Sequence, residues 1–317
     1  MSSKWEEMFL CPCVYYRLFI TLIKYKTVTS LAFIWKLDEI LEKIFCPGLC
    51  HSQAMTNLIN DLSATGLLVL MVSIFVICSL FTLFLAQKYC FWLRLSDQGI
   101  FGEIFANTMP TIFGFILAFV TISVWQNYNT VNDRVLQEGH RLYNLYRTIN
   151  AYPTEVKGMG KGLLKNYATE VIKTEWPLLT QGQFDVKAFK EFNAVESLIV
   201  NFKPNTLGEL AAQQEMLRQL SEYRELRRAR IENAKSFIDP PLWAALFLSA
   251  ELLILFSVLF KTHNIRMHAL MTSIVGTSLG IVFFLLVLYN NPFLGPNAIQ
   301  PTAFKNLLES FAILDAS

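Results

Sequence analysis

The stretch GFILAFVTISVWQNYNTVNDRVLQEGHRLYNLYR, residues 114–147, begins as a segment suited to lipid and ends as one suited to water. It contains no proline and no turn signal, so the sequence predicts one continuous helix across this change. Trp125 and Tyr128 stand where the apolar part ends, and aromatic residues of this kind are typical anchors at a membrane–water interface. We therefore expect a single helix to cross a membrane and to continue beyond it.

Four apolar stretches decide the class of protein. The stretches 62–87, 104–126 and 267–291 contain no charged residue, and the stretch 242–260 contains one, Glu251. A helix needs roughly 20 residues to cross the hydrocarbon core of a bilayer, and each stretch is about that long. The sequence therefore predicts an all-α membrane protein with four transmembrane helices and a helical cytosolic block between the second and the third.

The distribution of Lys and Arg predicts the orientation of these helices. With four spans, the N-terminal segment, the long middle segment and the tail share one side of the membrane. Together they hold 23 of the 27 Lys and Arg residues. The positive-inside rule places that side in the cytoplasm, so we expect a multi-pass protein of the cell inner membrane with both termini cytoplasmic. The expected regions are a cytoplasmic N-terminal segment (1–61), a first transmembrane helix pair (62–126), a helical cytosolic region (127–241), a second transmembrane helix pair (242–291) and a cytoplasmic tail (292–317).

The N-terminal segment carries two separate signals. Residues 14–45 are mostly apolar, but Lys24 and Lys26 interrupt them near the middle, where a basic side chain is costly in a bilayer. We therefore expect a helix that lies in the membrane interface. Four cysteines of the segment could bind zinc, although their spacings differ from the usual two-residue knuckle. Reduced thiols are the default alternative and acylation is a third; the four are Cys11, Cys13, Cys46 and Cys50.

Several classes of function find no support in the sequence. The net charge is only +2 and no basic run is interleaved with aromatic residues, so a nucleic-acid partner is not indicated. The GMGKG segment, residues 158–162, lacks the order of a phosphate-binding loop and fits a turn between helices. No catalytic arrangement of Ser, His and acid stands out. The sequence thus predicts no enzyme and no cofactor.

The plan of two spans, a helical block and two further spans resembles that of bestrophins. Gly114-Phe115, followed by Trp125-Gln-Asn-Tyr128, resembles the bestrophin pore helix, which has Gly-Phe and then Trp-Asn-Gln-Tyr at the same interval. The chain is more similar still to the bestrophin-like family of bacterial membrane proteins, over roughly residues 60–312. The residues that carry this similarity are Glu138, Leu142, Leu145, Tyr146, Arg147, Tyr167, Glu175, Trp176, Leu226, Arg227, Arg228, Pro241, Trp243, Pro292, Phe293 and Gly295.

The resemblance implies a pentamer in which five copies of the second span line an axial pore and five helical blocks form a vestibule. The bestrophin neck positions fall on Asn107, Thr111 and Phe115, which are spaced to share one helix face. Bestrophins also bind calcium through acids after the last span, but the first acid here is Glu309, so calcium gating is not expected.

Each candidate residue has a structural alternative. Phe115 could face lipid or a neighbouring helix, and Asn107 and Thr111 could form hydrogen bonds between helices. Glu251 is a functional candidate because it is an acid within a span, or it is a protonated acid bonded to a Ser or Thr of another helix. The basic residues before the third span are also candidates. We expect them to form a solvated face, with an anion-collecting vestibule as the alternative; they are Arg224, Arg227, Arg228 and Arg230.

Two classes of function follow. The first is an oligomeric ion channel in the lipid bilayer, expected to be a homopentamer. Anions are slightly favoured over cations as the permeant ions, because the neck positions contain no acid. The second is a membrane-anchored scaffold or sensor whose cytosolic helices bind a partner protein. The size of the native particle separates the two.

Overall fold

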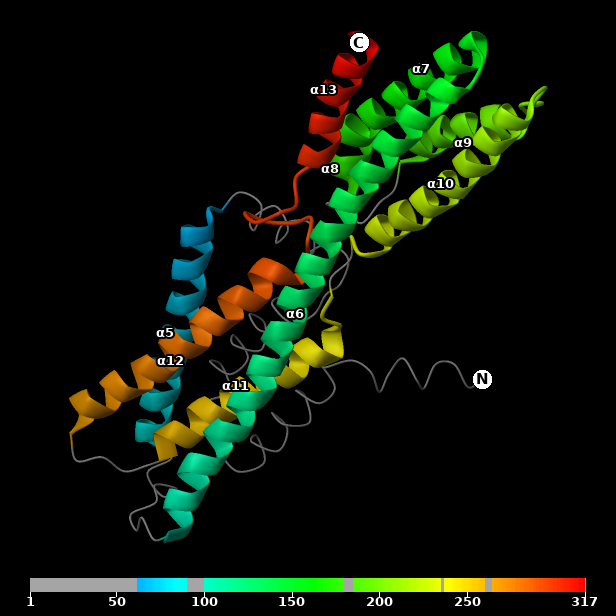
Figure 1. The fold of residues 1–317 in the computed structure, drawn as a ribbon. Coiled ribbons are helices and arrows are strands. Elements are labelled where there is room, and N and C mark those ends of the chain that lie inside the picture. The colour runs from blue at the N-terminus through cyan, green and yellow to red at the C-terminus, as the bar shows by residue number, and fades with distance from the viewer. Residues whose placement is uncertain (1–61, 90–99, 180–184, 235–236, 260–263, 317) are drawn as a thin grey trace, which may run out of the picture. The chain divides into compact units, whose positions relative to one another are not determined.

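The computed structural model describes residues 62–89, 100–179, 185–234, 237–259 and 264–316 (Figure 1). Every regular element in these ranges is a helix and none is a strand, so the all-α fold expected from the sequence is confirmed. The chain divides into two compact units. We call them the membrane unit and the polar unit and describe each by itself.

The membrane unit takes in the described residues within 62–121 and 238–286. Its helices are long and apolar enough to cross a bilayer, which confirms the four spans expected from the sequence. They are α5 (Ala64–Tyr89), the first part of α6 (Ile100–Thr148), α11 (Pro240–Leu259) and most of α12 (Ile265–Asn290).

Two glycines allow α12 to approach α5 closely. A Cβ atom on Gly280 would lie 2.7 Å from Cα of Val72, and one on Gly276 would lie 2.9 Å from the carbonyl oxygen of Phe75. Contacts this short leave room only for glycine, and small residues four positions apart are a common means of bringing membrane helices together. Nearby, the ring of Phe283 lies 4.6 Å from that of Phe75 and 4.9 Å from that of Phe247, so aromatic contacts join α5, α12 and α11.

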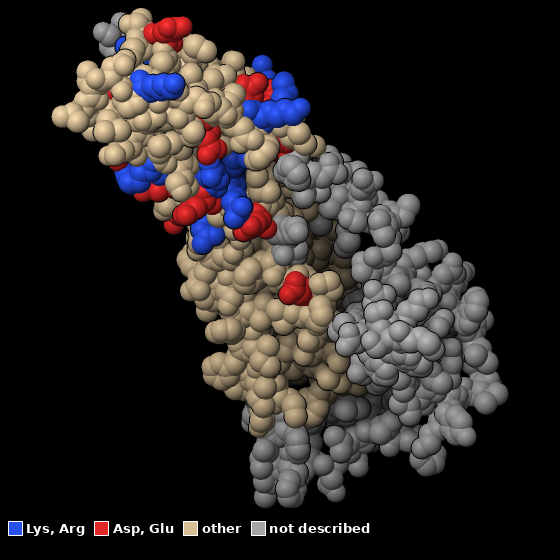
Figure 2. Space-filling view, turned by 90° about the vertical axis from the view of Figure 1, so that its right-hand side faces the viewer, with Lys and Arg blue, Asp and Glu red and all other residues tan. Residues whose placement is uncertain are grey.

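The polar unit takes in the described residues within 122–237 and 287–317. On the face drawn in Figure 2, charged side chains gather over one part of the described surface and are nearly absent from the rest. After the remainder of α6 come a 3₁₀ turn (Ile149–Ala151), α7 (Thr154–Glu170), a π-helix (Val171–Glu175), α8 (Trp176–Leu179), α9 (Val186–Val200), α10 (Leu207–Glu232) and the C-terminal α13 (Thr302–Ala316). The turn expected at the GMGKG segment, residues 158–162, is wrong, because these residues lie inside α7.

The core of the polar unit forms where the helical pattern of the sequence predicts it. Val131, Val135, Leu142 and Leu145 recur at helical spacing in α6, and all four are buried. Side-chain caps fix the start of two helices. Asp185 accepts bonds from the first backbone N–H groups of α9, and the Thr206 hydroxyl accepts one from α10, as Asp and Thr do at the N-terminus of a helix.

Candidate functional site

The helix α6 exposes one unbroken stripe along most of its length. Its members follow one another at intervals of three or four residues, so they share one face of the helix. All are exposed on the single chain, and the side chains change from apolar to polar along the stripe. We call this face the α6 stripe; it consists of Thr108, Thr111, Phe115, Phe119, Ile122, Gln126, Thr130, Asp133, Gln137, His140, Asn144 and Arg147.

The opposite face of α6 is buried for a similar length. Phe113 and Leu117 are at most 7% exposed in the membrane unit, and the buried row continues through Val124 and the core residues of the polar unit. Among the four spans, however, α6 is the one that the described residues cover least. In the described part of the structure, one face of α6 is therefore fixed inside the chain and the α6 stripe is exposed.

The three residues expected to form the pore neck all lie on α6. Thr111 and Phe115 belong to the α6 stripe, and Phe115 is 74% exposed. Asn107 lies on the same helix one turn before Thr111, and its side chain is outside the described part of the structure.

The two aromatic residues expected at the membrane interface differ in their surroundings. Trp125 is about half exposed. The ring of Tyr128 packs at 5.1 Å against that of Tyr289, and its hydroxyl donates a hydrogen bond of 2.9 Å to the carbonyl oxygen of Asn297. Trp125 is thus available to an interface, whereas Tyr128 is tied to a later segment of the chain.

The remaining candidates of the sequence fall in two places. Glu251 lies in α11, where Oε1 is 3.4 Å from the hydroxyl oxygen of Thr82 in α5. The interfacial helix and the four cysteines of the N-terminal segment, Cys11, Cys13, Cys46 and Cys50, lie outside the described residues.

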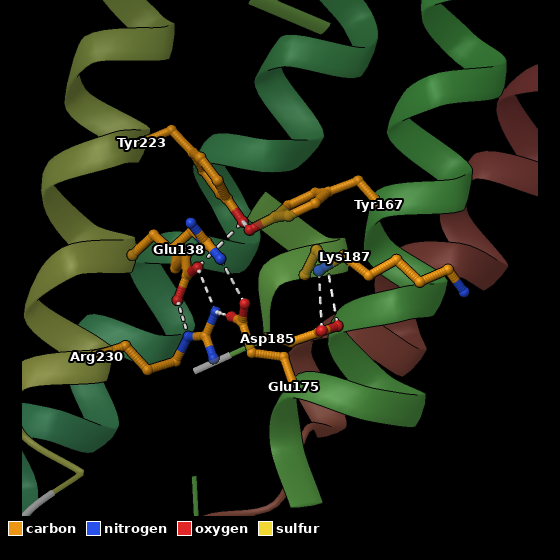
Figure 3. Close-up of polar contacts among 9 residues, drawn as sticks. Glu138, Tyr167, Glu175, Asp185, Lys187, Tyr223 and Arg230 are labelled. Atoms are coloured by element: carbon orange, nitrogen blue, oxygen red, sulfur yellow. Dashed lines mark hydrogen bonds and ion pairs between the residues drawn. The ribbon is translucent and has the colours of Figure 1, made fainter. Parts of the chain in front are cut away.

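A buried charged cluster lies inside the polar unit, and no single stretch of sequence contains it. In Figure 3, Arg230 of α10 faces Glu138 of α6 and Glu175 of the π-helix. Its Nε donates to Oε2 of Glu138 at 2.7 Å, and its Nη2 donates to Oε1 of Glu175 at 2.5 Å. Arg227 donates to the other oxygen of Glu175 at 2.5 Å. Two acids and two bases thus meet, and the charges balance.

Two tyrosines complete the cluster. The Tyr223 hydroxyl donates to Oε1 of Glu138 at 3.0 Å, and the phenol oxygens of Tyr223 and Tyr167 are 2.8 Å apart (Figure 3). Burial, followed by the nearby acids, raises the pKa of both tyrosines well above the usual value, so both are neutral. Burial alone would lower the pKa of Arg230, but Glu138 and Glu175 outweigh it and hold that pKa well above the usual value. Arg230 therefore keeps its positive charge between the two acids.

The cluster corrects the solvated basic face expected from the sequence. Arg227 is 7% exposed and Arg230 is 1% exposed, whereas Arg224 and Arg228 are exposed. The missed signal was a polar row at helical spacing: Tyr223, Arg227 and Arg230 are separated by four and three positions and so share the inner face of α10. Charged side chains usually lie at the protein surface, and the acids that allow these two arginines to be buried come from two other helices of the chain.

Comparison with known proteins assigns the family. A family model described as the Bestrophin-like domain matches residues 73–304, which is most of the chain. The chain belongs to the bestrophin-like family. No curated protein and no solved structure matches it. Membership supports a channel-type membrane protein.

Several of the residues that carry the similarity to the bestrophin-like family meet in the polar unit. Glu138, Tyr167, Glu175 and Arg227 all belong to the charged cluster. Trp176 and Phe293 pack edge to face at 5.6 Å, which joins α8 to the turn after α12. In this bestrophin-like chain several motif residues thus make contacts inside the polar unit, and through Glu138 these contacts include α6.

Proposed function

We propose that this bestrophin-like protein is a homopentameric ion channel whose pore is lined by the α6 stripe. The proposal includes an inner-membrane location, with both termini and the polar unit in the cytoplasm. The coarser statement, a channel-type membrane protein, rests on the family.

The α6 stripe is the observation that supports this proposal. A helix that merely crossed lipid would expose apolar residues within the membrane and then end or be covered. Here the same face stays uncovered for about eleven turns and becomes polar beyond Gln126. A face that is continuous from lipid depth into water suits a pathway for ions, and several copies of α6 around one axis would enclose it.

The charge of the stripe supports a weak preference for anions. From Thr108 to Gln126 it contains no charged residue, so no acidic ring would repel anions within the membrane. Beyond Gln126 it bears Asp133, His140 and Arg147, and one acid and one permanent base leave that part close to neutral. The apolar ring expected at Phe115 then sets the barrier for ions of either sign.

Opposite charges at one stripe position provide the test. Gln126→Lys should shift the reversal potential in a salt gradient towards that of the anion, and Gln126→Glu should shift it towards that of the cation, since the side chain would stand in the ion path. The matched control is Gln214, which is exposed on α10 away from the stripe; the same two substitutions there should leave the reversal potential unchanged. Equal effects at both positions, or none at Gln126, would exclude α6 as the pore lining.

The scaffold alternative has one observation in its favour. Leu207 and Leu210 are exposed at the start of α10, at 85% and 39%, and could contact a partner protein. A purified particle with the mass of a monomer or dimer and no ion flux in liposomes would favour this alternative. A particle of five chains with flux would favour the channel.

A further inference from the structure

A threonine and a glutamate from two helices meet inside the membrane unit. The hydroxyl oxygen of Thr82 lies 2.9 Å from the carbonyl oxygen of Cys78 in its own helix and 3.4 Å from Oε1 of Glu251 in α11. Around them α5 and α11 pack through apolar side chains, including Leu83 and Val258. The contact between Thr82 and Glu251 is therefore a polar link between α5 and α11, at the exposed edge of an otherwise apolar contact.

The protons at this link can be counted. A threonine hydroxyl has one proton, and a backbone carbonyl oxygen can only accept. The shorter contact assigns the Thr82 proton to Cys78, so the contact with Glu251 lacks a proton unless the carboxyl group supplies one. We propose that Glu251 is a proton-binding site inside the membrane, whose bound proton is donated to Thr82 and ties α11 to α5.

The surroundings of Glu251 agree with a bound proton. Among the described residues, Cys78, one turn from Thr82 on α5, interacts electrostatically with Glu251, and a thiol offers no positive charge. Among the described residues of the membrane unit, Lys88 and Arg266 are the cations, and both stand near helix ends. His268 lies on α12 with Nε2 3.3 Å from the carbonyl oxygen of Ser257, six positions and about 9 Å along α11 from Glu251.

Exposure gives a second, independent reason. Glu251 lies near the middle of α11 and is exposed on the single chain, so at this depth of a bilayer its side chain would face lipid or a second copy of the chain unless water reached it. An ionised carboxylate is costly in either place, whereas a protonated carboxyl group bonded to Thr82 is neutral. When the proton leaves, one Thr82 proton must serve both Cys78 and the carboxylate. The link then weakens, and the membrane unit becomes less stable as the pH rises.

Infrared difference spectroscopy on the full-length protein in lipid vesicles tests the proposal directly. At neutral pH the protein should show the carbonyl stretch of a protonated carboxyl group, and Glu251→Gln should remove that band. Thr82→Val removes the hydroxyl acceptor at nearly constant shape, so the band should remain but move to higher frequency, as expected for the loss of a hydrogen bond. Thr82→Ser should restore its position.

Thr121→Val is the matched control, because the Thr121 hydroxyl bonds only the carbonyl oxygen of Leu117 in its own helix among the contacts described, at 2.7 Å. This variant should leave the band where it is.

Thermal unfolding adds a second measurement. The amide of Glu251→Gln can donate to Thr82 at every pH, so this variant should lose the fall in melting temperature that the parent shows at alkaline pH. The absence of a protonated band from Glu251 at neutral pH, or a band that Thr82→Val does not move, would overturn the proposal. Neither result depends on whether the protein conducts ions.

Discussion

Arg230→Met tests how much the buried charged cluster contributes to folding. Arg230 is 1% exposed and donates three bonds, two to Glu138 and one to Glu175. Methionine can occupy the space of the aliphatic stem, but it removes the charge. Glu175 then keeps Arg227 as its basic partner, whereas Glu138 is left with the hydroxyl of Tyr223. Removal of one partner from a buried ion pair costs about 3–5 kcal/mol, because the remaining charge stays out of water without compensation.

The loss should be visible as a lower melting temperature of the purified protein, followed by tryptophan fluorescence. For a unit of about 150 residues, 1 kcal/mol corresponds to a shift of about 2–4 °C, so we expect a fall on the order of 10 °C. Arg224→Met is the control, because Arg224 pairs with Glu196 at the surface, and such pairs contribute about 0–1 kcal/mol.

A double variant separates charge from packing. Arg230→Met leaves the cluster with one negative charge in excess, and Glu138→Gln in the same chain restores the balance with Arg227 and Glu175. We expect the double variant to recover a large part of the lost stability. An Arg230→Met protein that melts within a degree or two of the Arg224→Met protein would refute the reasoning, and so would a double variant less stable than Arg230→Met alone.

Three further changes test other parts of the molecule. Phe115→Ala should increase ion flux in liposomes without changing the mass of the particle, because it opens an apolar constriction; unchanged flux with a lower melting temperature would place Phe115 against lipid or another helix. Gly280→Ala should destabilise the membrane unit, because its Cβ would meet the backbone of Val72. Gly114→Ala should not, because no atom lies within 4 Å of the new Cβ. Equal melting temperatures of the two variants would contradict the close approach of α12 to α5. Hydrogen bonds from two lysines and a tyrosine hold the pKa of Asp315 well below its usual value, so its contribution to stability is present above the unfolded pKa, near 4, and is lost as the pH falls further. Asp315→Asn should therefore flatten the decline in melting temperature that we expect of the parent over that acidic range. A parallel decline in both proteins would show that the pairing contributes nothing.

The parts of the fold that the sequence predicts are those that depend on local order. Four apolar stretches of about 20 residues predict four spans, because lipid imposes length and composition on each helix separately. The continuity of α6 and its buried row, including Val131 and Leu142, follow from helical spacing. The close approach of Gly276 and Gly280 to α5 does not, because a glycine pair in one span does not identify the helix that it meets.

The charged cluster escaped prediction for a related physical reason. Arg230 and Glu138 are 92 positions apart, so their attraction appears only after folding has brought α10 against α6. The π-helix adds a second obstacle, since it changes the spacing at which Glu175 and the next residue, Trp176 of α8, are buried. The basic residues of α10, taken by themselves in the sequence, are equally compatible with an exposed face and with a buried one.

The two faces of α6 are linked by the geometry of one helical turn. Gln137 and His140 belong to the α6 stripe, while Glu138, between them in sequence, points to the other side and is bonded to Arg230. Successive residues differ by about 100° around a helix, so a rotation of α6 large enough to replace Gln137 on the stripe would draw Glu138 away from Arg230. That movement would leave charges buried without partners. The charged cluster therefore holds the rotational setting of α6 in the polar unit, and with it the choice of side chains on the face that we propose lines the pore.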